Sequence, residues 1–133
     1  QKSKIDTKEF QANGWYKTIW EITNVLPGSK LEKGVAAFPD ELAYRLIKLF
    51  SYTGETVLDP FLGSGTTMKV AKQLERNSVG FEIIRDLDSV IRKKNNFTKG
   101  TDKNIFEVVE RDKGKYRFVT LDYIERKKNG NKS

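Results

Sequence analysis

The sequence predicts an α/β fold in which parallel strands are flanked by helices, followed by a C-terminal β-hairpin. In the middle of the chain, helical and strand-like patterns alternate, which is typical of a parallel sheet with right-handed crossovers. Here a short apolar run, 56–59, leads straight into a glycine turn and a helix-forming segment. Strand, glycine turn and helix in this order present backbone N–H groups and a positive helix dipole to a ligand. From about residue 98, two β-prone runs replace the alternation and predict the hairpin.

The composition limits the classes of function. The chain has 133 residues, of which 37% are hydrophobic, enough for one domain with a modest core. The sequence contains neither Cys nor His, so we expect no disulfides and no metal site of the usual zinc or iron kind. Because no run approaches the ~20 apolar residues of a membrane span and no signal peptide is evident, we expect a cytoplasmic protein without membrane contact. The net charge of +7 favours a polyanionic partner such as nucleic acid, although a basic solvated surface would carry the same charge.

The first elements are the least regular. Residues 1–14 are polar and end in the turn signal Asn13-Gly14, so we expect an N-terminal arm. Residues 15–22 are rich in aromatic and β-branched side chains and predict a strand, with these residues on one face: Tyr16, Thr18, Trp20 and Ile22. A loop containing Pro27-Gly28-Ser29 follows.

The first clear helix is predicted over residues 39–50. Pro39 suits the first helical position, and the two acidic residues after it stabilise the positive end of the helix dipole. Four residues fall on one apolar stripe, of the kind that faces a core, namely Leu42, Leu46, Leu49 and Phe50. Ala43 and Ile47 lie beside this stripe.

The alternating region continues with a strand over 56–59, a helix from Thr66 to about Glu75, a strand over 78–83 and a helix over 85–94. The basic residues of the last helix favour a solvated helix face over a DNA contact; they are Arg85, Arg92, Lys93 and Lys94.

The C-terminal part is predicted to be a hairpin extension over 98–125, with strands at 105–110 and 116–121. The basic residues 126–133 predict either a frayed tail or an arm that contacts phosphates.

The glycine turn carries the strongest functional signal. Gly63 and Gly65 allow the backbone to approach a ligand where a Cβ would block it. Thr66 and Thr67 stand at the helix start, where hydroxyls can cap free N–H groups or bind a ligand. Glu82 closes the next predicted strand, and an acid about 20 residues past a glycine turn accepts ribose hydroxyls in nucleotide-type sites.

Other nucleotide sites fit less well. A P-loop needs a lysine after its glycines, and a dinucleotide fingerprint needs a third glycine where Met68 stands. A carboxylate at Asp59 would repel a pyrophosphate but would suit an ammonium group. S-adenosylmethionine, with a ribose at one end and an ammonium group at the other, fits both acids.

The run Asp59-Pro60-Phe61-Leu62-Gly63-Ser64-Gly65-Thr66-Thr67 closely resembles the cofactor motif of amino-group DNA methyltransferases, which form N6-methyladenine or N4-methylcytosine. The segment 36–49 resembles that family's His-Pro-Ala-x-Phe-Pro segment and its helix, and this order is that of the permuted subgroup called the beta class. Residues 20–22 and 79–83 resemble two further strands of the family. Gly34 and Val35 depart from its usual His-Pro.

The resemblance implies a partial class I S-adenosylmethionine-dependent (Rossmann-like) fold over residues 15–97 and assigns roles within it. Asp59 would hold the methionine ammonium group, Glu82 the ribose hydroxyls, and Ile83 would pack on the adenine. The remaining implied cofactor-binding residues are Ala36, Ala37, Phe38, Pro39, Pro60, Phe61, Gly63, Ser64, Gly65, Thr66 and Thr67. Phe38 and Phe61 are also compatible with a plain role as core aromatics.

The base-holding motif of the family, (Asp/Asn/Ser)-Pro-Pro-aromatic, does not occur in this sequence. We therefore expect no catalytic residue here, and a C-terminal cofactor-binding half whose catalytic half lies on a missing segment or a second polypeptide. A decayed copy, a basic nucleic-acid-binding module with a relic turn, and a methyltransferase of RNA remain alternatives. DNA is the expected substrate, self-association is expected from an unfinished core, and the target base stays open.

Overall fold

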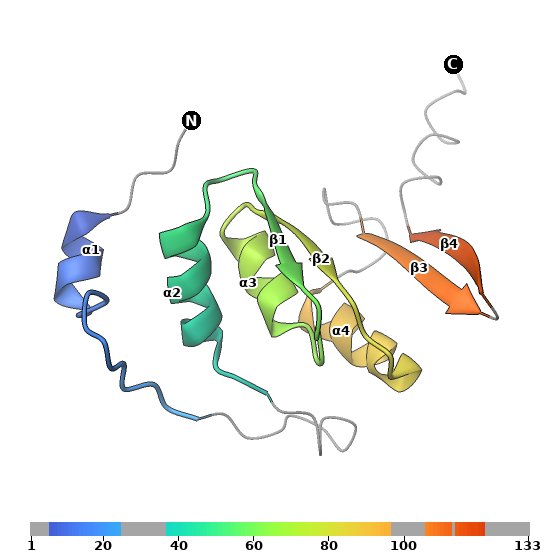
Figure 1. Ribbon diagram of the computed structural model, residues 1–133, viewed down its shortest axis with the longest axis horizontal. Coiled ribbons are helices and arrows are strands. Elements are labelled where there is room, and N and C mark those ends of the chain that lie inside the picture. The colour runs from blue at the N-terminus through green and yellow to red at the C-terminus, as the bar shows by residue number, and fades with distance from the viewer. Residues whose placement is uncertain (1–5, 25–36, 97–105, 113, 122–133) are drawn as a thin grey trace. The chain divides into compact units, whose positions relative to one another are not determined.

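The computed structural model describes residues 6–24, 37–96, 106–112 and 114–121. The chain divides into two compact units, residues 1–95 and 96–133, which are described separately. Figure 1 shows the helices and strands of both units. Among the described residues, none of the helices has the length and apolar character needed to span a membrane.

The first unit is built on a pair of parallel strands. β1 (Thr56–Asp59) pairs with β2 (Asn77–Gly80) along their whole length, and α3 (Thr66–Gln73) forms the crossover between them. Asp59 pairs with Gly80, so both strands end at the same edge of the sheet. α2 (Asp40–Phe50) lies beside α3, as Figure 1 shows. These elements confirm the predicted α/β arrangement of parallel strands flanked by helices.

The core of this unit lies between α2 and α3. Ala43 and Ile47 of α2 pack against Val70 and Ala71 of α3. Partly buried residues surround this cluster, namely Phe38, Tyr44, Val57 and Leu74. The apolar stripe predicted on α2 is therefore not the buried one, because the side chain of Phe50 is 79% exposed and that of Leu46 is 42% exposed. The most apolar face of α2 has no cover within the described part of the chain.

Residues 15–22 do not form the predicted strand. The structure places turns and bends there, and no strand lies within 6–24. Trp15 is buried with its ring edge against Tyr44 of α2, and the Arg45 guanidinium lies over the rings of both Trp15 and Trp20. Trp20 Nε1 also donates to the carbonyl of Trp15, so the segment folds back on itself and packs onto a helix instead of pairing in a sheet.

Part of the predicted N-terminal arm is helical. α1 (Thr7–Ala12) begins after Asp6, whose carboxylate accepts the backbone N–H groups of Lys8 and Glu9. Glu9 connects this helix to α2, since its carboxylate accepts a hydrogen bond of 3.0 Å from the Tyr44 hydroxyl and forms an ion pair with Lys48.

The second unit is the predicted hairpin. β3 (Phe106–Asp112) and β4 (Lys115–Leu121) pair antiparallel, with Phe106 opposite Leu121 and Asp112 opposite Lys115. The strands run further toward the turn than predicted, and Gly114 takes the positive φ of 79° that such a turn requires. The predicted basic tail, 126–133, lies outside the described residues.

Candidate functional site

The carboxyl ends of β1 and β2 form the candidate site. Asp59 is the last residue of β1, and its Oδ1 accepts the backbone N–H of Phe61 at 3.0 Å. The turn that follows reaches α3 through Gly65, which caps the helix with a left-handed φ of 86°. Parallel strands that end together bring their following loops to one edge of the sheet, where ligands bind in α/β proteins.

Glu82 lies beyond the end of β2, because this strand stops at Gly80 and not at residue 83 as predicted. Its carboxylate takes over from the strand pairing. Oε2 accepts the N–H of Gly63 at 2.9 Å, while Oε1 accepts those of Ile83 and Ile84 at 2.8 Å each. The acid thus joins the glycine turn to the segment that leads into the last helix of this unit.

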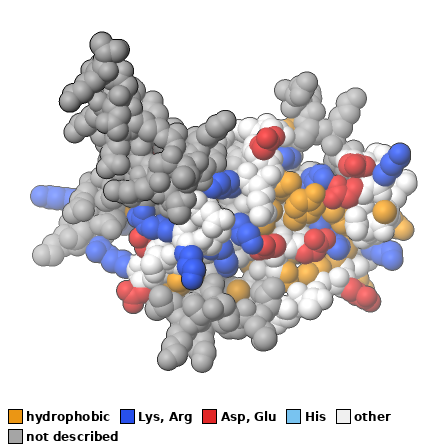
Figure 2. Space-filling view, turned by 180° about the vertical axis from the view of Figure 1, so that it is seen from behind, with side chains coloured by type: hydrophobic (Ala, Val, Ile, Leu, Met, Phe, Trp, Pro, Cys, Tyr) orange, Lys and Arg blue, Asp and Glu red, His pale blue; other side chains and the backbone are white. Residues whose placement is uncertain are grey.

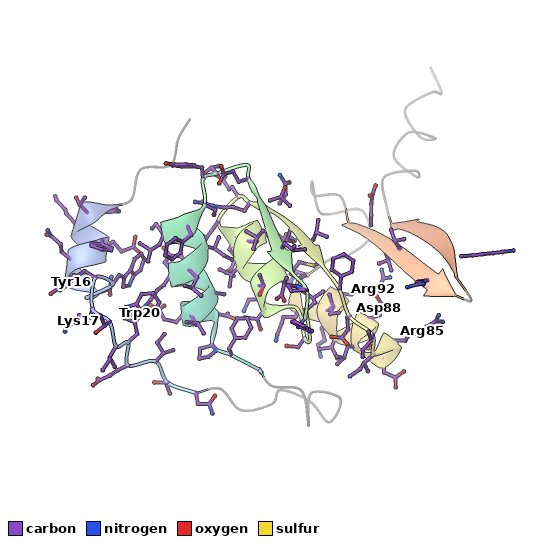
Figure 3. All side chains as sticks on the ribbon, viewed as in Figure 1. Tyr16, Lys17, Trp20, Arg85, Asp88 and Arg92 are labelled. Atoms are coloured by element: carbon purple, nitrogen blue, oxygen red, sulfur yellow. The ribbon has the colours of Figure 1, made fainter. Side chains whose placement is uncertain are left out.

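That helix is also shorter than predicted. A 3-10 turn, η2 (Arg85–Leu87), precedes α4 (Asp88–Lys94). On α4 the Arg92 guanidinium pairs with Asp88 at 2.7 Å, and Figure 3 labels both residues together with Arg85 of η2. These charges are partly or fully exposed, as expected for a solvated face.

Two glycines are required by close packing. A Cβ on Gly65 would lie 2.9 Å from Asn95 Nδ2, in addition to the backbone strain of its positive φ. A Cβ on Gly80 would lie 2.7 Å from a methyl group of Leu62. Leu62 is buried over Gly80, and its N–H donates to the Phe81 carbonyl, so the turn after β1 is fastened to the segment after β2.

Lys94 and Asn95 are contacts of the turn that the sequence analysis did not identify. The ammonium group of Lys94 donates to Ser64 Oγ at 2.5 Å and to Thr66 Oγ1 at 3.2 Å. Asn95 is buried at the end of α4, and its amide donates to the carbonyls of Ile91 and Gly65. Lys94 therefore does not belong to the solvated face predicted for its basic group. The contacts span 28–30 residues, a separation at which sequence periodicity carries no signal.

The other predicted site residues fall into two groups. Phe61 and Ile83 project outward from the turn region, with side chains 87% and 94% exposed, and Pro60 is also exposed. Ala37, Phe38 and Pro39 precede α2, where Phe38 packs against the core cluster. Thr67, in the first turn of α3, is half-buried, and Ala36 lies outside the described residues.

One face of the sheet is uncovered. Leu58 and Val79 are register partners on the side of the sheet opposite the half-buried Val57, and both are exposed, as is Phe81 just beyond β2. We call Leu58, Val79 and Phe81 the open sheet face. On the opposite side of the molecule, Figure 2 shows further hydrophobic side chains gathered where α1 and α2 lie, with acidic and basic groups between them. An apolar surface of this kind is typical of an interface.

The site can bind a ligand with a cation at one end and a diol at the other. Among the described residues, Asp59 uses only Oδ1 in a hydrogen bond, so Oδ2 is open to an ammonium group. Glu82 Oε2 accepts one N–H and keeps a second lone pair for a hydroxyl.

Comparison with known proteins gives matches of one kind. A family model for DNA methylases (N6_N4_Mtase) matches residues 1–93. The chain is 48% identical over 89 residues to the type II methyltransferase M.MjaI of Methanocaldococcus jannaschii, covering 66% of this chain and 29% of that protein. It is 44% identical over 92 residues to M.MthZI of Methanothermobacter thermautotrophicus, covering 66% and 26% respectively. The chain thus spans less than a third of the length of either relative.

Two solved structures of a Thermus thermophilus protein assigned as a DNA modification methylase are also similar. The first, a selenomethionine derivative, has a TM-score of 0.53 at 30% identity and covers 69% of this chain and 35% of that one. The second, a complex with S-adenosyl-L-methionine, has a TM-score of 0.52 at 26% identity and covers 71% and 36%.

Proposed function

Because this chain belongs to the DNA methylase family, we propose that it is the S-adenosylmethionine-binding part of a DNA methyltransferase that modifies an exocyclic amine, N6 of adenine or N4 of cytosine. The observation that carries the proposal is the arrangement of Asp59 and Glu82 at the ends of paired parallel strands, with the glycine turn between them bound to Glu82. The complex of the similar Thermus protein with S-adenosyl-L-methionine supports the choice of cofactor.

In this proposal the open oxygen of Asp59 holds the ammonium group of the cofactor, and Glu82 holds the ribose hydroxyls. The N–H groups at the start of α3 and the hydroxyls of Ser64, Thr66 and Thr67 bind the methionine carboxylate. When bound, S-adenosylmethionine supplies an electrophilic methyl group attached to a positively charged sulfur. The residues of this chain orient that group and do not touch the base.

We further propose that the base is held by another polypeptide segment, either a partner chain or a part of the protein outside this sequence. The sequence contains no Pro-Pro-aromatic motif, and the relatives are more than three times as long as the matched region. Phe61 and Ile83, exposed beside the acids, suit a cofactor pocket closed from the other side. In this proposal the open sheet face and the exposed stripe of α2 are the surfaces that the remaining segment covers.

A thermal-shift titration of the 133-residue chain with S-adenosylmethionine tests the cofactor proposal. A ligand that binds only the folded state raises the melting temperature. We expect a concentration-dependent increase that is lost in Asp59→Ala and in Glu82→Ala. Asp86→Asn, an exposed acid outside the site, is the matched control and should keep the increase. No increase at millimolar cofactor, or an equal increase in all four proteins, would contradict the proposal.

A methylation assay tests the division of labour. With radiolabelled cofactor and DNA, we expect no methyl transfer by this chain alone. Measurable transfer by the isolated chain would overturn the proposal that the base-holding residues lie elsewhere.

A further inference from the structure

The sharpest unassigned feature of the molecule is the contact of Lys94 with the glycine turn. Lys94 is the last residue of α4, and its ammonium group lies 2.5 Å from Ser64 Oγ and 3.2 Å from Thr66 Oγ1. Both hydroxyl residues are only 4% exposed. A positive charge is thus held beside two buried hydroxyls at the first turn of α3.

The direction of these hydrogen bonds decides what the hydroxyls can do. An ammonium group only donates, so Ser64 Oγ and Thr66 Oγ1 both act as acceptors toward Lys94. Each hydroxyl keeps one hydrogen of its own, and donating to an oxygen lone pair leaves that hydrogen free to point away from the lysine. The lysine therefore prepares both hydroxyls to donate to a third group, and its charge makes an anion the favoured acceptor.

The position of Lys94 is fixed by the structure around it. The next residue, Asn95, is buried, and its amide donates to the Gly65 carbonyl and to Ile91 of the same helix. Lys72 of α3 in turn donates to the Asn95 carbonyl at 2.9 Å. The end of α4 is thereby fastened to both the glycine turn and the crossover helix, which holds the lysine against Ser64.

We propose that Lys94 is a positioning residue that makes the glycine turn selective for a ligand carrying a carboxylate, by orienting the hydroxyls of Ser64 and Thr66 as donors. The inference rests on the proposed function, since the methionine end of S-adenosylmethionine carries such a carboxylate. It adds a cationic determinant on α4 to a site otherwise lined by two acids. Arg92 and Lys93 of the same helix do not share this role, because Arg92 pairs with Asp88 and Lys93 is exposed.

Calorimetry with two ligands tests the inference on the 133-residue chain. S-adenosylhomocysteine carries the amino-acid carboxylate, whereas 5′-methylthioadenosine has the same nucleoside and thioether without the amino-acid end. We expect Lys94→Met to weaken binding of S-adenosylhomocysteine about tenfold, the effect of losing a charge-assisted hydrogen bond. Binding of 5′-methylthioadenosine should change less than about twofold, because that ligand has no carboxylate.

Two further variants separate charge from fold. Lys94→Arg keeps the charge and should retain most of the affinity for S-adenosylhomocysteine, whereas Lys93→Met, on the exposed face, should bind both ligands like the wild type. If Lys94→Met does not fold, Ser64→Ala takes its place and should show the same selective loss.

Each remaining outcome counts against the inference. Equal weakening of both ligands would show that Lys94 only supports the fold, and unchanged binding of S-adenosylhomocysteine would show that it has no part in recognition. A wild-type chain that binds neither ligand would overturn the proposed function itself, which distinguishes that failure from failure of the role of Lys94 alone.

Discussion

The Glu82 carboxylate accepts the backbone N–H of Gly63 at 2.9 Å, which joins the acid after the second strand directly to the turn after the first. The two parts of the candidate site are therefore one hydrogen-bonded assembly, and a change at either part affects the other. The same carboxylate accepts two further N–H groups from the residues that follow it.

Glu82→Ala is expected to destabilise the chain as well as the cofactor site. It removes the acceptor of the Gly63, Ile83 and Ile84 N–H groups, and the loss of such charge-assisted bonds costs about 1–3 kcal/mol. Urea denaturation measures the change in the free energy of unfolding. Glu107→Ala, an exposed acid of β3, is the control and should stay within about 0.5 kcal/mol of the wild type. Equal stability of the two variants would contradict the role of Glu82.

Gly65→Ala and Gly54→Ala form a matched pair. Both glycines have nearly the same positive φ, 86° and 85°, so both variants carry the backbone strain of about 1–2 kcal/mol. A Cβ on Gly54 would meet no atom within 4 Å, whereas one on Gly65 would meet Asn95 at 2.9 Å and Ile91 at 3.3 Å. We expect Gly65→Ala to be the less stable by a further ~1 kcal/mol or more. Chemical denaturation of both variants gives this difference directly, and a value near zero would mean that α4 yields to the added methyl group.

Asp6 is expected to make stability depend on pH. The hydrogen bond from the Glu9 N–H lowers the pKa of the Asp6 carboxyl below its ordinary value of 3.8. Because the folded-state pKa is the lower one, the stabilisation is present above pH 3.8 and is lost as the pH falls through the folded-state pKa. Asp6→Ala should therefore melt at a lower temperature than the wild type at pH 7, and the difference should shrink in acid. A difference that is constant down to pH 2 would contradict this assignment.

The open sheet face is expected to cause self-association of the isolated chain. Leu58 is 62% and Phe81 61% exposed, side by side at the ends of paired strands, where burial against a second surface is favourable. Sedimentation velocity at rising concentration should show association that weakens in Leu58→Ser and in Phe81→Ser. Tyr52→Ser, which removes an exposed aromatic ring from the turn after α2, is the control. A monomer at every concentration would argue that this face needs no cover.

Much of the fold was predictable from the sequence because local patterns and tertiary contacts agree there. The strand at 56–59 and the start of the next helix at Thr66 lie where the patterns placed them, since a glycine turn fixes the boundary between them. The hairpin is also confirmed, because its two β-prone runs are close in sequence and pair with each other.

The errors arise where long-range packing overrides the local pattern. The aromatic residues at 15–22 are strand-like by composition, yet Trp15 and Trp20 are occupied by Arg45 of α2, a contact that no periodicity reveals. The second strand ends early because the Glu82 carboxylate, and not a neighbouring strand, accepts the next N–H groups. The contact of Lys94 with Ser64 was missed for the same reason, whereas the acids and glycines of the turn are adjacent to predictable strand ends.

The family match ends at residue 93, just before the boundary between the two units after Asn95. The helix end that clamps the turn is thus the last component of the shared module, and the hairpin begins a separate cassette. A natural exchange or laboratory graft of whatever follows position 96 leaves every hydrogen bond of the turn described above in place, so diversification of the appendage is uncoupled from conservation of the module.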